Sequence, residues 1–414
     1  MGDPLEQLGG HLSSAWSPQV GWAFTLALVL AVPGISRAEG PAGVLALKRS
    51  VVAHYAARAQ QAYDNAVEGA RHLAKAVESF VERPSASALI SAREAWLSAR
   101  VPFLHTEAFR FYDGPIDALD GMINAWPVDE SYIDYVADNP GAGVINQPQE
   151  FSPLSEALIL SLNEKEGEKN ISTGFHAIEF LLWGQDFATN GPGNRSWADY
   201  TDGKPHADRR REYLRVVTRL LVRHLETISA AWSSSDPTNY RAAFVTAEPD
   251  ESLAKILKGL GTLSGPELAG ERLTVPYETK DQEDEHSCFS DNTHNDIIHD
   301  ALGIQMAYLG RDLPSNPGVP GGPGIHDLLL RVAPDLAGAL AAGMERSVAL
   351  ARLIPPPFDQ AIQGPTGSKG RRAIQETISS LLEQSALIAR AAKALGAKLE
   401  LEPIRKGLAG GEPK

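Results

Sequence analysis

The sequence has 414 residues, of which 43% are hydrophobic and 22% are charged, and its formal net charge at pH 7 is -14. This composition excludes a largely disordered chain, and the length fits two domains of ordinary size. The negative charge argues against a nucleic-acid partner, because proteins that bind nucleic acids neutralise the phosphates with a basic surface.

The start of the chain is typical of a secretory signal peptide. An uncharged apolar run from Trp22 to Val32 is followed by Ser36-Arg37-Ala38, which offers small residues at the positions that signal peptidase recognises. The run is shorter than the ~20 residues that span a bilayer. We therefore predict a signal peptide over residues 1–38 and export to the periplasm. An uncleaved segment is the alternative, because Asp3 and Glu6 precede the run where Lys or Arg is usual.

Long amphipathic helices are predicted after this segment. Apolar residues at spacings of three and four predict a helix from Leu45 to Val81. Ser85 is a suitable N-cap for a second helix towards Phe109, in which Pro102 predicts a kink. Residues 113–151 are rich in Gly, Pro, Asp and Asn, which predicts a long ordered loop with short helical turns.

Helical periodicity dominates the rest of the sequence, and no alternating run of β-branched residues predicts a strand. We therefore expect an all-α protein of two packed helical bundles with long ordered loops. The further helices are predicted at 154–162, 173–183, 209–232, 250–263, 294–309, 325–354 and 371–399, with loops at 184–206 and 311–324. The expected parts are the signal peptide 1–38, an N-terminal bundle 39–235, a C-terminal bundle 236–400 and a tail 401–414.

The most informative motif is Gly-x-His-x-x-Glu at Gly174, His176 and Glu179. His176 and Glu179 share one helical face, at about 5–6 Å between Cβ atoms, so they can bind one metal ion together. The flanking residues are apolar, which predicts burial, and a buried charge needs a partner. A structural hydrogen bond between the two side chains is the alternative. Ser172 or Thr173 would cap the helix, and Gly174 would let a backbone or a ligand approach closely.

A second group of candidate residues lies on the helix that contains Pro102. Trp96, Arg100 and Glu107 are four and seven residues apart, near one helical face. Glu107 is a candidate second carboxylate ligand, and Arg100 and Arg110 can orient carboxylates or bind an anion. A structural ion-pair helix is the alternative.

A third group is the polar segment 285–294, where Ser287, Ser290 and Asp291 are expected to line a cleft. A surface loop is the alternative. Cys288 is the only cysteine, so neither an internal disulfide nor a zinc site of several thiolates can form. No matched base marks it as a nucleophile. Possible extra ligands are His286, His294 and His299.

Three segments resemble the imelysin-like family, which is also classed as peptidase M75. The Gly-x-His-x-x-Glu signature is GFHAIEFLLWGQD, and two further segments resemble the iron-regulated protein A branch: AWLSARVPFLHTEAFRFYDGPID and QEDEHSCFSDNTHNDII. The resemblance spans about 43–397. It implies two packed helical bundles, a periplasmic or outer-membrane-associated location, and a role in iron uptake or iron-responsive physiology. It also implies a site between the bundles that includes His176 and Glu179 and is faced by the segments of Glu107, Arg110, Ser287 and Asp291.

Three functions are compatible with these sequence features. The first is a protein that binds iron or another divalent metal, with an iron-uptake membrane protein as a partner. The second is a metallopeptidase, which is weaker because the pair supplies two ligands and no separate base, and the sequence has no His-Glu-x-x-His helix. The third is a scaffold for a non-metal ligand. For the metal-binding function, the expected ligands are His176, Glu179, Glu107 and Asp291. The residues expected to line the cleft are Gly174, Arg100, Arg110, Ser287 and Trp96.

Overall fold

The structure is a computed structural model that describes residues 41–188, 190–312 and 321–399. Within these ranges it consists of helices and loops, with no β-strand and one isolated antiparallel bridge between Val136 and Asn139. The predicted all-α fold is therefore confirmed. The elements in chain order are α1 Pro41–Glu82, α2 Ala86–Leu104, η1 His105–Phe109, α3 Asp120–Ile123, α4 Glu130–Ile133, α5 Gly143–Asn146, α6 Glu156–Leu162, α7 Gly174–Trp183, η2 Trp197–Tyr200, α8 Ala207–Ala231, α9 Tyr240–Thr246, α10 Pro249–Thr262, η3 Leu263–Thr274, α11 Val275–Thr279, η4 Gln282–Asp284, α12 Thr293–Leu309, α13 Ile325–Val332, α14 Pro334–Ala351, α15 Phe358–Gln363 and α16 Lys369–Leu395.

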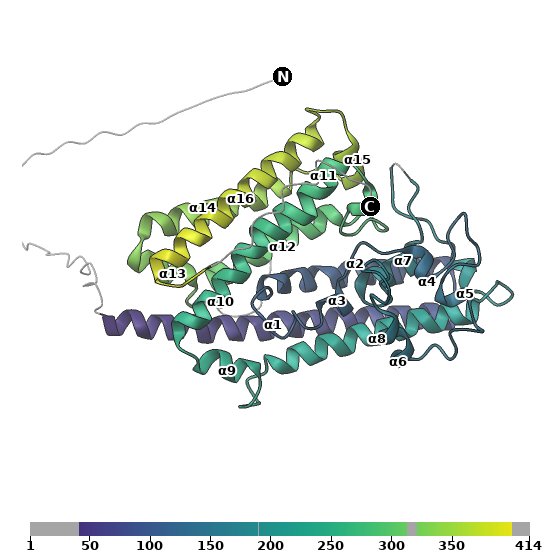
Figure 1. Cartoon of the computed structure of the whole chain (residues 1–414), viewed down its shortest axis with the longest axis horizontal. Helices are drawn as coiled ribbons and strands as arrows, with labels where there is room; N and C mark the ends of the chain where they lie inside the picture. The colour runs from purple at the N-terminus through teal and green to yellow at the C-terminus, as the bar shows by residue number, and fades with distance from the viewer. Residues whose placement is uncertain (1–40, 189, 313–320, 400–414) are drawn as a thin grey trace, which may run out of the picture. The chain divides into compact units, whose positions relative to one another are not determined.

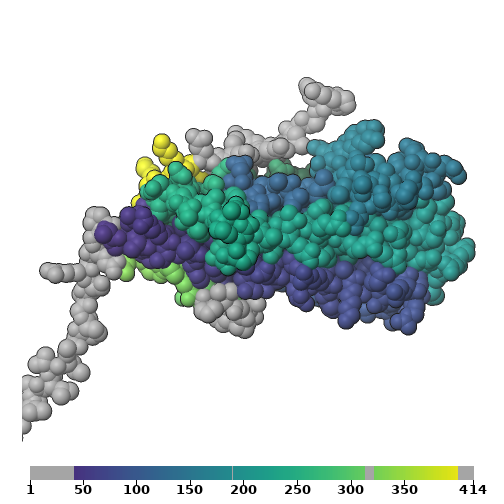
Figure 2. Space-filling view, turned by 90° about the horizontal axis from the view of Figure 1, so that it is seen from below, coloured from purple at the N-terminus to yellow at the C-terminus, as the bar shows by residue number. Residues whose placement is uncertain are grey.

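The first group of helices forms around α1. This helix packs against both α2 and α8, and α7 packs against α2 and α8. Figure 2 shows α1, in purple, beside α8, in teal, on one face of the protein. The residues of α1 that recur at helical spacing, such as Val52, Tyr63 and Leu73, are buried. One apolar stripe along the helix thus explains why α1 stays helical over its full length.

The end of α2 determines where the next functional residues lie. The hydroxyl of Ser85 accepts a hydrogen bond from the backbone N–H of Ala88 at 3.2 Å, so the predicted N-cap is confirmed. Pro102 lies in the last turn of α2, and the chain then continues as the short 3-10 helix η1. Proline has no N–H to donate to the preceding turn, which favours an end to the α-helix near this point.

The second group consists of α10, η3, α12, α14 and α16. In Figure 1, α14 and α16 lie side by side, and α16 also contacts η3 and α10. The single helix predicted over 325–354 is wrong, because α13 and α14 are separate and Pro334 begins the second one. The helix predicted over 250–263 continues into η3, a π-helix that contains Pro266. The last helix ends at Leu395 rather than at residue 399, because Gly396 adopts a left-handed conformation.

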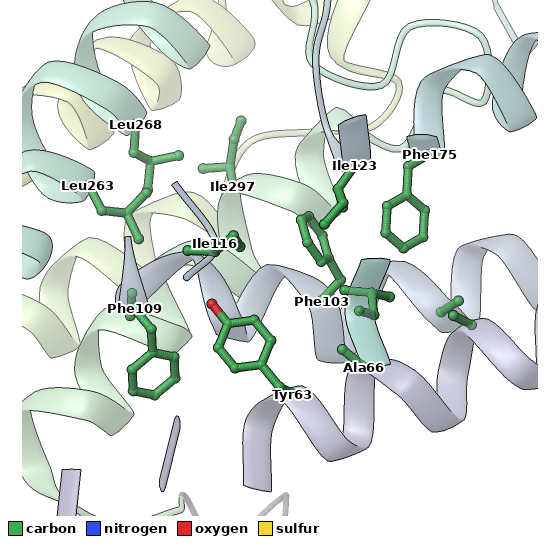
Figure 3. Packing of buried hydrophobic residues seen from close by; sticks show 14 of the residues in the cluster. Tyr63, Ala66, Phe103, Phe109, Ile116, Ile123, Phe175, Leu263, Leu268 and Ile297 are labelled. Atoms are coloured by element: carbon green, nitrogen blue, oxygen red, sulfur yellow. The ribbon is translucent and has the colours of Figure 1, made fainter. Parts of the chain in front are cut away.

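One apolar core joins the two groups. Figure 3 shows residues of both groups in a single cluster of buried side chains. Contacts of α12 with η1 and α2, and of α1 with α10, connect the groups directly. The core residues labelled in Figure 3 are Tyr63, Ala66, Phe103, Phe109, Ile116, Ile123, Phe175, Leu263, Leu268 and Ile297.

The predicted signal peptide (1–38) and C-terminal tail (401–414) lie outside the described residues. The boundary predicted between residues 235 and 236 stays a prediction. Among the helices that the structure describes, none has the length and apolar character needed to cross a membrane.

A buried carboxylate fixes the two long loops that the sequence predicted at 113–151 and 184–206. Asp134 is fully buried and accepts hydrogen bonds from Arg195 at 2.5 Å and from Arg210 at 2.6 Å. Burial raises the pKa of Asp134, but the two guanidinium groups outweigh that effect and lower it to about 2. The ion pairs therefore tie both loops to α8.

The ion pairs of Asp134 should give stability that depends on pH. The pKa of Asp134 lies below its unfolded value of 3.8, so this contribution is present above about pH 5 and is lost as the pH falls to 2. The free energy of unfolding of the wild type should fall by about 2 kcal/mol more than that of Asp134→Asn over this window. Urea denaturation at each pH measures the difference, and equal pH dependence in the two proteins would contradict it.

Candidate functional site

The Gly-x-His-x-x-Glu motif lies on α7, a short helix whose ten residues are all buried. Thr173 occupies the N-cap position, but its hydroxyl donates to the carbonyl oxygen of Met122 at 3.0 Å. The hydroxyl of Ser172 donates to the carbonyl oxygen of Ile159 at 2.7 Å. The predicted side-chain cap is therefore wrong, and both hydroxyls instead fasten the start of α7 to neighbouring segments.

Gly174 permits a close contact between α7 and the end of α3. Its φ is +85°, and a Cβ atom at this position would lie 2.5 Å from the carbonyl oxygen of Ile123. The predicted close approach is confirmed, and the approaching group is a backbone. The next residue, Asn124, is thereby placed beside the side chain of His176.

The side chains of His176 and Glu179 face each other at hydrogen-bond distance. The Nδ1 atom of His176 lies 2.7 Å from Oε2 of Glu179, and Nε2 lies 3.2 Å from Oδ1 of Asn124. The other oxygen of Glu179, Oε1, accepts hydrogen bonds from the backbone N–H of Ser290 at 2.9 Å and from its hydroxyl at 2.6 Å. His176 is 2% exposed and Glu179 is 0% exposed, so the predicted burial is confirmed.

Burial keeps this pair uncharged at neutral pH. Burial, and then the charge of Arg100, hold the pKa of His176 well below its usual value. Burial raises the pKa of Glu179 to about 8, against the opposing effects of Ser290 and Arg100. A protonated Glu179 would donate to Nδ1 of His176, which would leave Nε2–H to donate to Oδ1 of Asn124. A neutral pair avoids the cost of two isolated buried charges.

A second layer of polar residues surrounds the pair. Arg100 of α2 donates to Oδ1 of Asn124 and to Oδ2 of Asp296 in α12, both at 2.6 Å. The Oδ2 atom of Asp296 also contacts the hydroxyl of Ser287 at 2.7 Å and Nδ1 of His286 at 2.8 Å. Burial raises the pKa of Asp296, but Arg100 and His286 outweigh that effect and hold it well below its usual value. Asp296 is therefore the ionised partner of Arg100.

Aromatic side chains hold Arg100 in place. The guanidinium carbon of Arg100 lies 5.0 Å from the ring centre of Phe175 and 5.5 Å from that of Trp96. The indole N–H of Trp96 donates to the carbonyl oxygen of Phe175 at 2.9 Å. Trp96 thus connects α2 to the first turn of α7 and packs beside the guanidinium group of Arg100.

Glu107 lies in a neighbouring cluster of ion pairs. Its Oε2 atom accepts hydrogen bonds from Arg110 at 2.7 Å and from Arg272 of η3. Arg110 also binds Asp120 at 2.5 Å, and Arg272 binds Asp300 at 2.8 Å. Burial raises the pKa of Glu107, but the two arginines outweigh that effect and lower it to about 2. In this structure Glu107 therefore forms ion pairs, which matches the alternative of a structural ion-pair helix given for this group of residues.

The third predicted segment contributes through Ser287 and Ser290 rather than through Asp291. Asp291 is half-buried and has a φ of +56°, and its pKa is raised to about 7 by burial and by the neighbouring Asp186 and Asp359. Among the possible extra ligands, His286 belongs to the second layer, whereas His299 contacts His105.

The sequence did not identify several residues that complete the two clusters. Asp296 and Asp300 are four residues apart on α12, and this spacing on one helical face was a usable signal. The others lie in loops or in η3 and reach the site only through tertiary contacts. The residues that were missed are Asn124, Arg272, Asp296 and Asp300, together with Trp126, whose ring centre lies 5.2 Å from the guanidinium carbon of Arg272.

The donor atoms near the pair are of the kind that bind hard or borderline metal ions. An imidazole, a carboxyl group, the amide oxygen of Asn124 and the hydroxyl of Ser290 meet here. Among the described residues, no group of three or more His, Cys, Asp or Glu side chains is arranged to hold a metal ion. Amide, hydroxyl or carbonyl oxygens, or water molecules, would therefore have to complete the coordination sphere of an ion bound by His176 and Glu179.

The family assignment rests on comparisons along most of the chain. A family model described as imelysin, peptidase M75, matches residues 59–388. The chain is 25% identical over 331 residues to iron-regulated protein A of Synechococcus elongatus, covering 77% of this chain and 79% of that protein.

Two crystal structures share the fold. One is of a protein from Parabacteroides distasonis described as an iron-regulated protein A precursor, with a TM-score of 0.66, 19% identity and coverage of 85% of this chain and 95% of that chain. The other is of an imelysin-like protein from Psychrobacter arcticum, with a TM-score of 0.60, 15% identity and coverage of 86% and 97%. Because the family model spans well over half of the sequence, the chain belongs to the imelysin family.

Proposed function

We propose that this protein binds an iron ion, or another divalent cation, between His176 and Glu179 and takes part in iron uptake. The observation that carries the proposal is the buried contact of 2.7 Å between Nδ1 and Oε2. Two ligand atoms about 2.1 Å from one ion and at right angles to each other lie about 3 Å apart. The two side chains therefore need to separate only slightly to admit an ion.

Supporting groups are close to this contact. The Oδ1 atom of Asn124 and the hydroxyl of Ser290 already contact His176 and Glu179 and would serve as further oxygen donors, with water. The pair shares a proton in the metal-free protein, so binding a cation would release it. The proposed role in iron uptake is also supported by the relative from Synechococcus elongatus, which is described as an iron-regulated protein. A periplasmic location and transfer to a membrane partner belong to this proposal.

A metallopeptidase is the second candidate function, and burial of the pair argues against it. A peptidase needs an open metal position, a water molecule, a general base and room for a polypeptide. His176 and Glu179 are closed off by packed side chains, and a bare ion needs far less opening than a peptide does. Chelator-sensitive cleavage of an unstructured protein that disappears in Glu179→Gln would favour the peptidase. A coloured cofactor in protein purified from cells would favour a non-metal ligand instead.

Titration of tag-free, metal-stripped protein with Fe²⁺ under anaerobic conditions tests the proposal. Wild type should bind one ion at this site, and the double variant His176→Ala, Glu179→Gln should lose more than about 100-fold in affinity, because loss of supporting residues alone costs 10–100-fold. The matched control is His72→Ala, Glu82→Gln, which removes an exposed His and an exposed Glu from α1 and should bind as wild type does. Equal affinity in the wild type and the His176/Glu179 variant, or no binding by either, would refute the assignment.

A further inference from the structure

A second pair of potential metal ligands lies outside the site described above. The Nε2 atom of His105 in η1 and the Nδ1 atom of His299 in α12 are 3.1 Å apart. The ring centres are 5.2 Å apart, and the ring planes are inclined by 55°. The two residues are 194 positions apart in the sequence, so the pair exists only because the two groups of helices pack together.

The backbone of both elements fixes this pair. Gly303 lies one helical turn after His299, and a Cβ atom at this glycine would lie 3.1 Å from the Cα atom and from the carbonyl oxygen of His105. The missing side chain lets η1 lie directly against α12. The hydroxyl of Thr106 donates to the carbonyl oxygen of Phe103 at 2.6 Å and ties η1 to the end of α2. The two imidazoles are therefore presented by rigid elements.

The separation of the two nitrogen atoms suits a shared ion. With metal–nitrogen bonds of about 2.0–2.1 Å, two ligand nitrogens lie about 2.9 Å apart at a right angle and about 3.4 Å apart at a tetrahedral angle. The value of 3.1 Å falls between these limits. A shared ion would replace the hydrogen bond that now joins the two nitrogen atoms, and both rings would have to turn so that their lone pairs meet at the ion.

We propose that His105 and His299 form a second metal site, which takes a divalent transition-metal ion that prefers imidazole, such as Zn²⁺. Imidazole suits Zn²⁺, Cu²⁺ and Ni²⁺, whereas oxygen ligands favour harder ions. The pair itself consists of two imidazoles, unlike His176 and Glu179, and the carboxylates of Glu68 and Asp312 only line the adjoining cavity, so the two sites should differ in the ions that they prefer. The proposal does not depend on the function proposed above.

A cavity beside His105 offers room for the remaining ligands. It has a volume of about 400 Å³ and is lined by His105, Gln61, Asn65 and Met306, among others. This is enough space for several water molecules, since one water occupies about 30 Å³ of liquid. Arg58 also borders the cavity, but its charge is balanced by an ion pair with Asp312. Two histidines with water ligands form an open site that exchanges its ion.

Zn²⁺ titration of the tag-free full chain tests this proposal, in the background His176→Ala, Glu179→Gln so that the first site cannot contribute. This background should bind one Zn²⁺ ion, and the additional change His105→Gln or His299→Gln should weaken binding at least tenfold. The control His72→Gln, in the same background, removes an exposed histidine of α1 and should leave binding unchanged. Unchanged affinity after His105→Gln or His299→Gln would overturn the proposal.

Electron paramagnetic resonance of bound Cu²⁺ provides a test that needs neither histidine of the pair to be replaced. The His176→Ala, Glu179→Gln protein should show a signal with two coordinated imidazole nitrogens. A signal with one nitrogen, or none from bound Cu²⁺, would overturn the proposal even if the His105 and His299 variants failed to fold. Loss of Fe²⁺ binding in the first titration together with a two-nitrogen Cu²⁺ signal would separate the two sites.

Discussion

Replacing Asp296 by asparagine is expected to lower the free energy of unfolding by about 3–5 kcal/mol, because it leaves a buried guanidinium group without its charge partner. Asp296 and Arg100 are both fully buried and are joined at 2.6 Å. The same carboxylate accepts hydrogen bonds from Ser287 and from Asn292. An amide keeps the shape of the side chain but loses the charge and half of the acceptors, so the network cannot be satisfied again.

Urea denaturation of Asp296→Asn measures this effect, and an exposed ion pair provides the control. Arg71 and Glu226 are joined at 2.6 Å, with side chains that are 56% and 44% exposed. Glu226→Gln should therefore change stability by less than about 1 kcal/mol. If Asp296→Asn lowers the free energy of unfolding by less than about 1 kcal/mol, Arg100 must find water or another partner. The polar residues around His176 and Glu179 would then not be sealed from solvent.

Replacing Gly174 by alanine is expected to destabilise the protein by about 3 kcal/mol. A left-handed conformation costs a residue with a Cβ atom about 1–2 kcal/mol, and overpacking adds about 1–3 kcal/mol. The Cβ atom would lie 2.5 Å from the carbonyl oxygen of Ile123. Both the new Cβ atom and this oxygen are attached to the backbone, so neither can move away without shifting a helix end. Asn124 would be displaced from His176, so the affinity for Fe²⁺ should fall as well.

Two other glycines separate the contributions to this loss. Gly203 has a φ of +89° with open space around it, so Gly203→Ala should cost only the conformational part, about 1 kcal/mol. Gly338 lies within α14 with open space and no positive φ, so Gly338→Ala should be neutral or stabilising by up to about 1 kcal/mol. If Gly174→Ala costs no more than Gly203→Ala, the contact with Ile123 is not a tight one.

The helices could be predicted because their apolar residues repeat at helical spacing against one continuous core. This holds for α1, α8 and α16, whose ends differ from prediction by a few residues. The prediction was wrong at Pro334, where the residue can begin a helix as easily as it breaks one. It also missed η3, where Pro266 and two glycines, Gly265 and Gly270, argue against a helix but tertiary packing holds the chain helical.

The central pair of the site could be predicted from the sequence, but its surroundings could not. His176 and Glu179 lie one turn apart on a local, strongly apolar helix, and local spacing determines their contact. Asn124 lies in a loop and reaches His176 only because Gly174 lets that loop approach. Arg272 reaches Glu107 from a segment 165 residues away. No local pattern encodes such contacts.

Diffraction from crystals of the protein grown anaerobically with Fe²⁺, measured on both sides of the iron absorption edge, tests the binding of iron most directly. The expected result is one anomalous peak about 2.1 Å from a ring nitrogen of His176 and from a carboxylate oxygen of Glu179. A map from iron-loaded crystals in which those two side chains keep their direct 2.7 Å contact, with no peak between them, would contradict the proposed site.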